Sequence, residues 1–182
     1  MRITTLLALL LGLFLAGSAA AQFAPPATPA VDPENTLLLD LSSGGRVAIQ
    51  LRPDVAPGHV ARIKELVGEG FYDGVVFHRV IDGFMAQGGD PTGTGTGGSS
   101  HPNLKAEFSR EPHVRGTASM ARANSPNSAN SQFFICFEDA RFLDNQYTVW
   151  GNVVEGMEHV DALPKGEPPR NPGKIVKASL RD

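Results

Sequence analysis

The stretch FHRVIDGFMAQGGDPTGTGTGG, residues 77–98, holds two features that could do chemistry. One arginine, Arg79, lies in an apolar run, and a ladder of glycines follows at positions 93, 95, 97 and 98. A dinucleotide fingerprint needs a helix after its glycines, and a Walker-type loop needs Gly-Lys-Ser/Thr. Here SSHPNLKAEFS follows, with a proline and no amphipathic period. We therefore interpret the ladder as a surface loop, a flexible exit from the Arg79 segment, rather than a phosphate site.

Metal and nucleophile chemistry find little support in the pattern. No two histidines stand at a metal-ligand spacing, and no second cysteine is present, so no metal site is expected; the histidines are His59, His78, His101, His113 and His159. His59 is expected on the surface of a helix, and His78 is expected to make a buried hydrogen bond. No Gly-x-Ser-x-Gly elbow occurs. Ser119 and Ser131 lack an adjacent base in sequence, which leaves a triad formed in space open.

An apolar groove around one arginine is a better candidate. Side chains at i and i+2 of a strand share a face. This groups Phe77, Arg79 and Ile81 on one strand, Met85 and Gln87 on a second, and Gln132 and Phe134 on a third. If these faces meet, apolar side chains surround one guanidinium and two carboxamides, which suits a small apolar ring and a peptide backbone. The plain alternative is that the aromatics are core and that the arginine keeps a sheet edge soluble.

Short strands must position these residues. Ser-Ser-Gly-Gly between two β-type runs predicts a hairpin, and Pro57 opens an amphipathic helix that Gly68 and Gly70 stop. A second, short helix is expected in GMEHVDALP, 156–164. The predicted strands are 36–41, 46–51, VVFHRVI (75–81), FMAQG (84–88), GTASMAR (116–122), SQFFICF (131–137), YTVWGNVV (147–154) and KIVKASL (174–180). About eight strands without βαβ alternation predict an antiparallel sheet that closes into a barrel or sandwich.

The N-terminus has the pattern of an export signal. Residues 1–21 carry one charge, Arg2, then an apolar run from Leu6 to Leu15 and a small-residue end, with cleavage expected near Ala21. The run is shorter than the roughly 20 residues that span a bilayer. The Pro/Ala-rich residues 22–35 are interpreted as a flexible segment, and residues 36–182 as one domain.

Composition limits the classes of partner. Removing residues 1–21 takes one of the 16 Lys and Arg and none of the 19 Asp and Glu, which leaves a net charge of −4. This mildly acidic balance argues against a nucleic-acid partner. The single cysteine, Cys136, excludes an internal disulfide, so stability depends on a hydrophobic core. Cys136 lies within QFFICF and is interpreted as a buried apolar residue rather than a reactive thiol.

Three ordered blocks resemble the cyclophilin family. They are FHRVIDGFMAQGGD (77–90), then GTASMAR (116–122) with NSQFFICF (130–137), then RFLDNQYTVWGNVVEGMEHVDAL (141–163). The resemblance runs from Thr36 to the C-terminus. It implies a mainly β fold, a closed eight-stranded antiparallel β-barrel capped by two α-helices, and peptidyl-prolyl cis–trans isomerase activity without a cofactor.

The resemblance also implies roles for individual residues. Arg79 would be catalytic, and the substrate-binding residues would be Phe84, Met85, Gln87, Ala121, Arg122, Ala123, Gln132, Phe134, Phe142, Leu143 and Tyr147. Phe142 and Tyr147 stand where many eukaryotic members have Trp and His, as in the bacterial branch. Loss of the indole N–H predicts weak binding of cyclosporin-type macrocycles. The segment ANSPNSAN, 123–130, differs in length from the common eukaryotic loop, so the correspondence of Ala123 is looser.

The function expected from this resemblance is rotation about X–Pro bonds in proline-containing peptides and unfolded proteins, which assists folding in the cell envelope. A periplasmic chaperone or proline-peptide binding module with incidental isomerase activity is the alternative, because the same groove would serve both. We expect a monomer in the periplasm or outside the cell, without nucleic acid and without a membrane anchor after signal cleavage. The loop 164–174 is interpreted as a plain loop, with a partner surface as the alternative.

Overall fold

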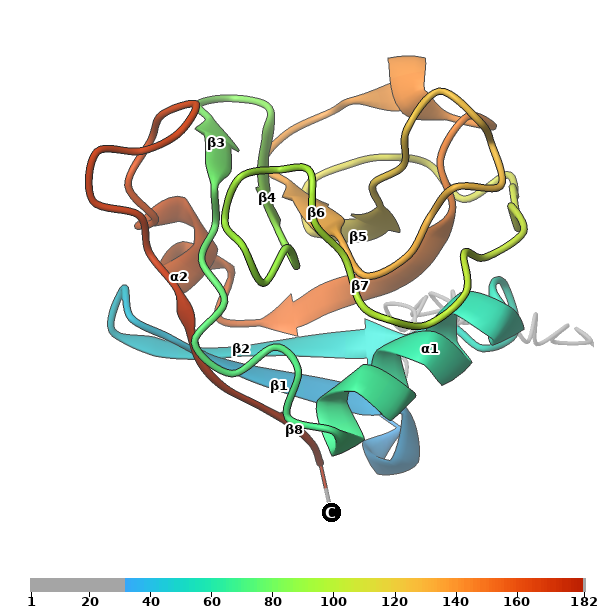
Figure 1. Cartoon of the computed structure of the whole chain (residues 1–182), viewed down its shortest axis with the longest axis horizontal. Coiled ribbons are helices and arrows are strands. Elements are labelled where there is room, and N and C mark those ends of the chain that lie inside the picture. Colours follow the sequence, from blue (N-terminus) through green and yellow to red (C-terminus); the bar gives the residue numbers. More distant parts are fainter. Residues whose placement is uncertain (1–31, 182) are drawn as a thin grey trace, which may run out of the picture. The chain divides into compact units, whose positions relative to one another are not determined.

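The computed structural model describes residues 32–181, so the predicted signal peptide and most of the predicted flexible segment lie outside the described residues. The described part contains one antiparallel sheet, two α-helices and two 3-10 helices (Figure 1). The strands are β1 Thr36–Leu41, β2 Gly45–Leu51, β3 Arg79–Ile81, β4 Met85–Gly88, β5 Thr117–Met120, β6 Phe133–Cys136, β7 Val149–Glu155 and β8 Ile175–Leu180. The helices are α1 Pro57–Gly68, α2 Met157–Asp161, η1 Pro33–Asn35 and η2 Arg141–Leu143.

The sheet is curled into an open half-barrel, so the expectation of a closed barrel is wrong. Its strand order is β3-β4-β6-β5-β7-β2-β1-β8, which leaves β3 and β8 at the two edges. Between these edges the chain makes only an isolated bridge, Val76 with Lys174, and single backbone bonds such as Phe77 N–H to the Gly173 carbonyl at 2.8 Å. The predicted strand 75–81 shortens to Arg79–Ile81 because the backbone before it makes these irregular contacts instead of a ladder.

Two separate apolar clusters lie on opposite faces of the sheet. On β6, Phe133 and Ile135 point into the main core, whereas Phe134 and Cys136 belong to a smaller cluster with Met85. This two-sided burial explains why SQFFICF is apolar throughout instead of alternating. Phe77 is fully buried in the main core and packs edge-on against Phe133. The predicted shared face of Phe77 and Arg79 is therefore wrong, since the chain is not a regular strand at residue 77.

The two α-helices cover different parts of the sheet. α1 begins at Pro57, which suits a first helical position, and packs on β7 and β8, whereas α2 packs on β2 (Figure 1). His59 of α1 is fully buried, contrary to the prediction, and its Nδ1 lies 2.6 Å from Glu107 Oε2. Burial lowers the pKa of His59, and the Glu107 carboxylate only partly offsets this. Among residues 32–181 no helix has the length and apolarity needed to cross a bilayer.

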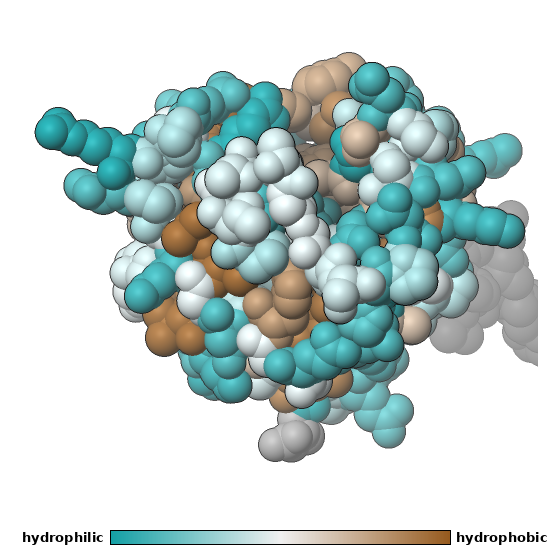
Figure 2. Space-filling view, in the orientation of Figure 1, coloured by the Kyte–Doolittle hydropathy of each residue, from teal (hydrophilic) through white to brown (hydrophobic). Residues whose placement is uncertain are grey.

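The surface is mostly polar. The face seen in Figure 2 carries mainly hydrophilic and near-neutral residues, with apolar side chains in small separate patches. The exposed large apolar side chains of the described part are Phe108, Phe142, Val154 and Val176. Phe142 is the most exposed of them at 67%.

Candidate active site

Sheet register brings the predicted site residues into one row. β3 pairs with β4 so that Arg79 faces Gln87, and β4 pairs with β6 so that Gln87 faces Phe134. Two residues further along the strands, on the same face of the sheet, Ile81 faces Met85 and Met85 faces Cys136. Directly opposed residues of an antiparallel pair have Cβ atoms about 4.5–5.5 Å apart. Three short strands therefore hold the guanidinium, the first carboxamide and the aromatic ring side by side.

A small cavity of about 180 Å³, the apolar pocket, opens over this row. Nine residues line it, and all were predicted as site residues: Arg79, Phe84, Met85, Gln87, Ala121, Arg122, Phe134, Leu143 and Tyr147. The other three lie next to it. Ala123 and Gln132 line an adjoining hollow, and Phe142 packs on Phe84 with ring centroids 5.5 Å apart. The structure thus gathers segments from residue 79 to residue 147 around one opening.

Phe134 forms an aromatic wall supported from behind. Its ring stacks on His113 at a centroid distance of 6.0 Å and meets Tyr147 edge-on at 5.7 Å. His113 is fully buried, with Nδ1 2.9 Å from Asp144 Oδ1 and Nε2 3.0 Å from Ser119 Oγ. Sequence reasoning missed this support, since only the fold brings His113 against Asp144, which is 31 positions away.

The set Ser119, His113 and Asp144 is the spatial triad that the sequence left open. Ser119 is fully buried, and its hydroxyl donates to the Thr148 carbonyl at 2.9 Å. A nucleophile must reach substrate and pass its proton to the histidine, and neither condition holds here. The triad therefore supports the pocket wall. Cys136 is equally inert, because burial raises the pKa of its thiol to about 12, as its interpretation as an apolar residue requires.

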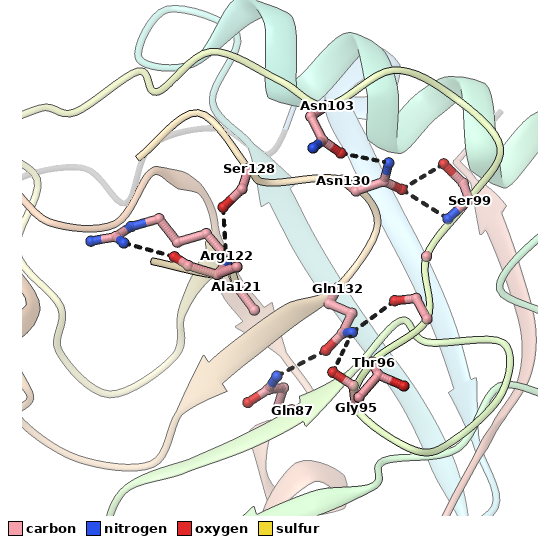
Figure 3. Close-up of a pocket in the computed structure, with 13 residues that line it drawn as sticks. Gln87, Gly95, Thr96, Ser99, Asn103, Ala121, Arg122, Ser128, Asn130 and Gln132 are labelled. Atoms are coloured by element: carbon pink, nitrogen blue, oxygen red, sulfur yellow. Dashed lines mark hydrogen bonds between the residues drawn. The ribbon is translucent and has the colours of Figure 1, made fainter. Parts of the chain in front are cut away.

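The two carboxamides are fixed by a chain of hydrogen bonds. Gln87 Nε2 donates to Gln132 Oε1 at 3.0 Å, and Gln132 Nε2 donates to the carbonyls of Gly95 at 3.0 Å and Gly97 at 2.8 Å (Figure 3). These residues border a polar hollow of about 510 Å³ that shares Gln87, Ala121 and Arg122 with the apolar pocket. The glycine ladder thus sets the orientation of both amides.

The ladder is a surface loop, as predicted, and it is wrapped around a buried carboxylate that the sequence did not indicate. Asp90 Oδ2 accepts from the backbone N–H of Gly95 at 2.7 Å and Gly97 at 3.0 Å, and Oδ1 accepts from Thr92 N–H at 2.8 Å. A Cβ at Gly97 would collide with Asp90 Oδ1, which explains glycine there. Burial raises the pKa of Asp90, but the N–H donors of Gly97, Thr92 and Gly95 outweigh it and hold the pKa well below its usual range.

Arg79 has a partner that the sequence did not indicate. Its Nε donates to Glu167 Oε2 at 2.9 Å, across 88 positions of the chain. Both residues also border a third cavity of about 490 Å³, the arginine hollow, together with His78 and Pro168. His78 is buried, but neither ring nitrogen finds a hydrogen-bond partner in the described part of the chain, contrary to the prediction. Burial lowers the pKa of His78 more than Asp90 raises it, which favours a neutral ring.

Arg122 braces the opposite side of the apolar pocket. Its guanidinium carbon lies 4.7 Å from the centre of the Tyr147 ring, and Nε donates to the Gln146 carbonyl at 2.9 Å. Nη1 donates to the carbonyl of Ala123, also at 2.9 Å. Arg122 therefore joins the loop after β5 to the loop before β7. Its Nε and Nη1 donate to neighbouring backbone, whereas Arg79 lies directly opposite Gln87 in the sheet.

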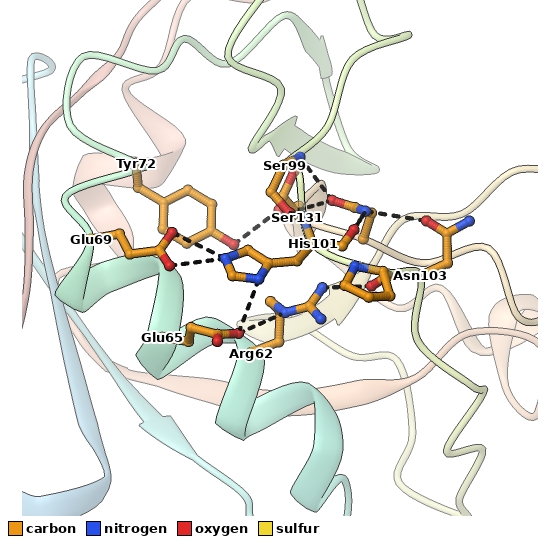
Figure 4. A network of polar contacts seen from close by, with 10 residues as sticks. Arg62, Glu65, Glu69, Tyr72, Ser99, His101, Asn103 and Ser131 are labelled. Atoms are coloured by element: carbon orange, nitrogen blue, oxygen red, sulfur yellow. Dashed lines mark hydrogen bonds and ion pairs between the residues drawn. The ribbon is translucent and has the colours of Figure 1, made fainter.

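A second polar cluster ties the wall of the polar hollow to α1. His101 Nε2 lies 2.9 Å from Glu69 Oε1, and its Nδ1 lies 3.7 Å from Glu65 Oε2 (Figure 4). Glu65, Glu69 and His101 each have an atom of a type that can bind a metal ion, and these three atoms lie within 4.8 Å of one another. The sequence spacing did not predict this grouping. Arg62 Nε also donates to Glu65 at 3.0 Å. Since the His101 carbonyl accepts from Asn130, the cluster positions the far wall of the polar hollow.

The fold and site define a class of protein. An antiparallel half-barrel that presents an apolar pocket beside one guanidinium and two fixed carboxamides can hold a small ring and the peptide backbone around it. The chain belongs to the cyclophilin-type peptidyl-prolyl isomerases, because the model of the family Cyclophilin type peptidyl-prolyl cis-trans isomerase/CLD matches residues 36–180. Its activity is accordingly peptidyl-prolyl cis–trans isomerisation.

Relatives and solved structures agree with this membership. The chain is 56% identical over 167 residues to a probable peptidyl-prolyl cis-trans isomerase of Brucella suis, covering 83% of this chain and 85% of the relative. It is 43% identical over 129 residues to peptidyl-prolyl cis-trans isomerase B of Bacillus subtilis, covering 70% and 89%. The crystal structure of the cyclophilin AquaCyp293 from Hirschia baltica matches with a TM-score of 0.76 and 34% identity, over 82% of this chain and 75% of the other.

A further solved structure bears on the ligand. A cyclophilin type peptidyl-prolyl cis-trans isomerase of Cryptosporidium parvum, crystallised in the presence of the dipeptide Ala-Pro, matches with a TM-score of 0.75 and 28% identity. The match covers 81% of this chain and 99% of the other. Peptides that contain proline are accordingly the ligand class associated with this fold.

Proposed function

We propose that the apolar pocket binds the proline ring and that Arg79 is the catalytic residue. The observation that carries this proposal is that nine side chains from five separate segments line one small cavity. Among them, Arg79 is 39% exposed and lies opposite Gln87 in the sheet. Phe84, Met85, Phe134 and Leu143 grip the ring, and Phe142 and Tyr147 extend the aromatic wall. The rate of X–Pro isomerisation by Arg79 variants is the measurement that tests the assignment.

The chemistry needs no bond to be made or broken. An amide resists rotation with a barrier of about 18–20 kcal/mol, because its nitrogen shares a lone pair with the carbonyl. At the twisted transition state this sharing is lost and the proline nitrogen becomes a better hydrogen-bond acceptor. A donor that meets this nitrogen stabilises the twisted state over both planar ones. The guanidinium of Arg79 carries N–H groups that can donate to this nitrogen.

Holding one side of the bond still is the second requirement. Gln87 and Gln132 are proposed to bind the peptide backbone, with Ala121, Arg122 and Ala123 lining the groove beside the pocket. Gln132 is already oriented by the carbonyls of Gly95 and Gly97, and Gln87 is oriented by Gln132. Such preorganisation lowers the entropy lost when substrate binds. The substrates that fit this arrangement are proline-containing peptides and unfolded chains, met by a monomeric enzyme.

A binding module with incidental catalysis is the second candidate, because the polar hollow adjoins the apolar pocket and is larger than it. Such a hollow could retain an unfolded segment without turning it. Variants of Arg79 distinguish the two functions, because peptide binding depends mainly on the pocket walls and rotation of the X–Pro bond depends on the guanidinium. A variant that binds peptide but does not isomerise it shows which of the two a cell requires.

Export to the periplasm is a further part of the proposal, with residues 1–21 as the signal and residues 36–182 as the enzyme domain. We expect the full chain, expressed in a Gram-negative host, to appear in the periplasmic fraction in a processed form. Mass spectrometry of its N-terminus should place cleavage near Ala21. A matched chain with two apolar residues of the Leu6–Leu15 run changed to Asp should stay cytoplasmic and unprocessed. Equal distribution of the two chains would contradict export by this segment.

Weak cyclosporin binding is expected from the identity of the rim residue. Phe142 presents a 67% exposed ring with no polar donor, whereas an indole at this position would offer an N–H. We expect the inhibition constant for cyclosporin to be larger than micromolar. Phe142→Trp should lower this constant about tenfold, which corresponds to one hydrogen bond. Phe108→Trp, at another exposed phenylalanine, is the control. Nanomolar inhibition of the unchanged protein would contradict the prediction.

A further inference from the structure

The segment after α2 forms an extra edge on β3. Val80 N–H donates to the Gly166 carbonyl and Gly166 N–H donates to the Val80 carbonyl, both at 2.8 Å. This is an antiparallel bridge with both hydrogen bonds made. In antiparallel pairing, the residues on either side of a bridged pair also face each other, so Glu167 falls opposite Arg79. The contact between Arg79 and Glu167 is therefore set by backbone geometry rather than by a chance approach of two long side chains.

The sequence KGEPP, residues 165–169, holds this edge in shape. Gly166 has a φ of 149°, and a Cβ there would come within 2.6 Å of Pro169 Cα, so only glycine fits. Lys165 Nζ donates to the Asp161 carbonyl at 2.8 Å and lies 4.0 Å from the centre of the Phe137 ring. Two consecutive prolines with fixed φ follow Glu167. A segment built this way can hold a carboxylate at a defined point.

The Glu167 carboxylate contacts Arg79 at Nε, which leaves the N–H groups of both Nη atoms of Arg79 available. Within residues 32–181 the hydrogen bond from Nε to Glu167 is the one that the Arg79 side chain makes. A guanidinium has five N–H donors, so contact through Nε leaves the four on the two Nη atoms. Arg79 borders both the apolar pocket and the arginine hollow, while Glu167 borders only the hollow. Glu167 thus holds the guanidinium from the side that faces away from the apolar pocket.

We propose that Glu167 is a positioning residue for Arg79, which restrains the guanidinium through Nε so that its Nη donors meet the proline nitrogen as the bond twists. The inference rests on the proposed catalytic role of Arg79. A free arginine side chain populates many rotamers, and a donor that must find its position loses part of its effect on the barrier. Because the pair is exposed, it contributes little to folding stability. The effect of Glu167 should therefore appear in the rate of turnover.

The test compares Glu167→Gln with Glu158→Gln, an exposed carboxylate of α2 that lies outside all three cavities. Steady-state isomerisation of a proline peptide is measured on the full chain, with kcat and KM separated. We expect Glu167→Gln to lower kcat about tenfold with KM within about twofold, and Glu158→Gln to change neither. The ¹⁵N-labelled protein should show a shifted Arg79 Nε–H signal in Glu167→Gln alone, and both variants should unfold at the urea concentration of the unchanged protein.

A second background separates positioning from a general effect of charge. In Arg79→Lys the side chain has no Nε–H, so adding Glu167→Gln should change the residual rate by less than about twofold. An equal tenfold loss in both backgrounds, or an unchanged kcat in Glu167→Gln together with the shifted Nε–H signal, overturns the inference. If Glu167→Gln retains full activity while Arg79→Ala does not, the inference alone fails. If Arg79→Ala is itself fully active, the catalytic assignment fails and the inference fails with it.

Discussion

Arg79→Ala is expected to lower kcat/KM for X–Pro isomerisation by about two to three orders of magnitude and to leave the fold intact. Removal of one donor that acts only at the transition state lowers turnover by roughly 10²–10³-fold in other enzymes. Arg79 lies at the sheet edge and is 39% exposed, so its truncation removes neither core packing nor a ladder hydrogen bond. A protease-coupled proline isomerisation assay, with circular dichroism and urea unfolding beside it, measures both parts of the expectation.

Arg79→Lys keeps the charge and discriminates between two explanations of that loss. If the planar guanidinium is needed, the lysine variant should also be impaired by at least about tenfold, because an ammonium lacks the rigid fork of donors. If any positive charge suffices, it should be nearly as active as the unchanged protein. Arg110→Ala, at an exposed arginine outside the three cavities, is the control and should retain full activity. Full activity of Arg79→Ala would remove Arg79 from the mechanism.

The affinity of Arg79→Ala for a proline peptide distinguishes an isomerase from a binding module. The apolar side chains of Phe84, Met85 and Phe134, which we propose to bind the proline ring, remain in Arg79→Ala. The dissociation constant for a proline peptide should therefore change by less than about threefold. Complementation of a host that lacks its own isomerases then reports which property matters. Rescue by the catalytically silent variant would favour the binding module.

Part of the site could be predicted from local patterns because it lies on short strands, whereas Phe84, Leu143 and Tyr147 were implied only by the resemblance to the cyclophilins. Arg79, Met85, Gln87 and Phe134 fall on β3, β4 and β6, where alternation fixes the face once the register is known. Phe77 failed the same rule, because the chain before β3 leaves strand geometry to contact residues 173–175. Periodicity predicts which face a side chain takes only where regular strand pairing continues. Nothing in VVFHRVI marks the residue at which that pairing begins.

The residues that could not be predicted act through contacts distant in sequence. Glu167 reaches Arg79 from 88 positions away, in a segment that composition describes only as a Pro-rich loop. His113 lies in a loop and supports Phe134 from behind, a contact for which sequence has no periodic signal. The glycine ladder, predicted to be a surface loop rather than a phosphate site, nevertheless binds an anion of its own chain. Glycine-rich loops that present backbone N–H groups to an anion look alike, whether the anion is a phosphate or a carboxylate of the same chain.

Asp90 is that carboxylate, and Asp90→Asn is expected to destabilise the protein by about 2–3 kcal/mol. Two backbone N–H groups point at Oδ2 and one at Oδ1. The asparagine side chain has one acceptor oxygen where aspartate has two. Its NH₂ group must therefore face the N–H donors that point at either Oδ1 or Oδ2 of Asp90. Hydrogen bonds to a charged acceptor contribute about 1.5–3 kcal/mol, and an unpaired buried donor costs about 1–3 kcal/mol. Urea unfolding at pH 7 measures the difference.

The effect on activity should follow from the same contacts. Gly95 and Gly97 donate their N–H groups to Asp90 and offer their carbonyls to Gln132. Loosening the ladder therefore releases Gln132 and, through it, Gln87. We expect kcat/KM of Asp90→Asn to fall about tenfold through a raised KM, at a temperature where the variant is still folded. Glu158→Gln, at an exposed carboxylate outside the three cavities, is the control and should change neither stability nor rate.

In acid the unchanged protein and Asp90→Asn should become more alike in stability, and the sign follows from the lowered pKa of Asp90. A carboxyl whose pKa is lower in the folded state stabilises that state fully above its unfolded pKa, about 3.9, and progressively less as pH falls toward the folded value. The stability difference between the unchanged protein and Asp90→Asn should therefore be constant from pH 7 to about pH 5 and shrink below about pH 4. Other acidic groups with lowered pKa values, such as Asp73 and Asp161, titrate in both proteins and cancel from the difference. A difference that grows in acid would mean that the ladder binds the protonated carboxyl more tightly than the carboxylate, contrary to the three N–H groups that face it.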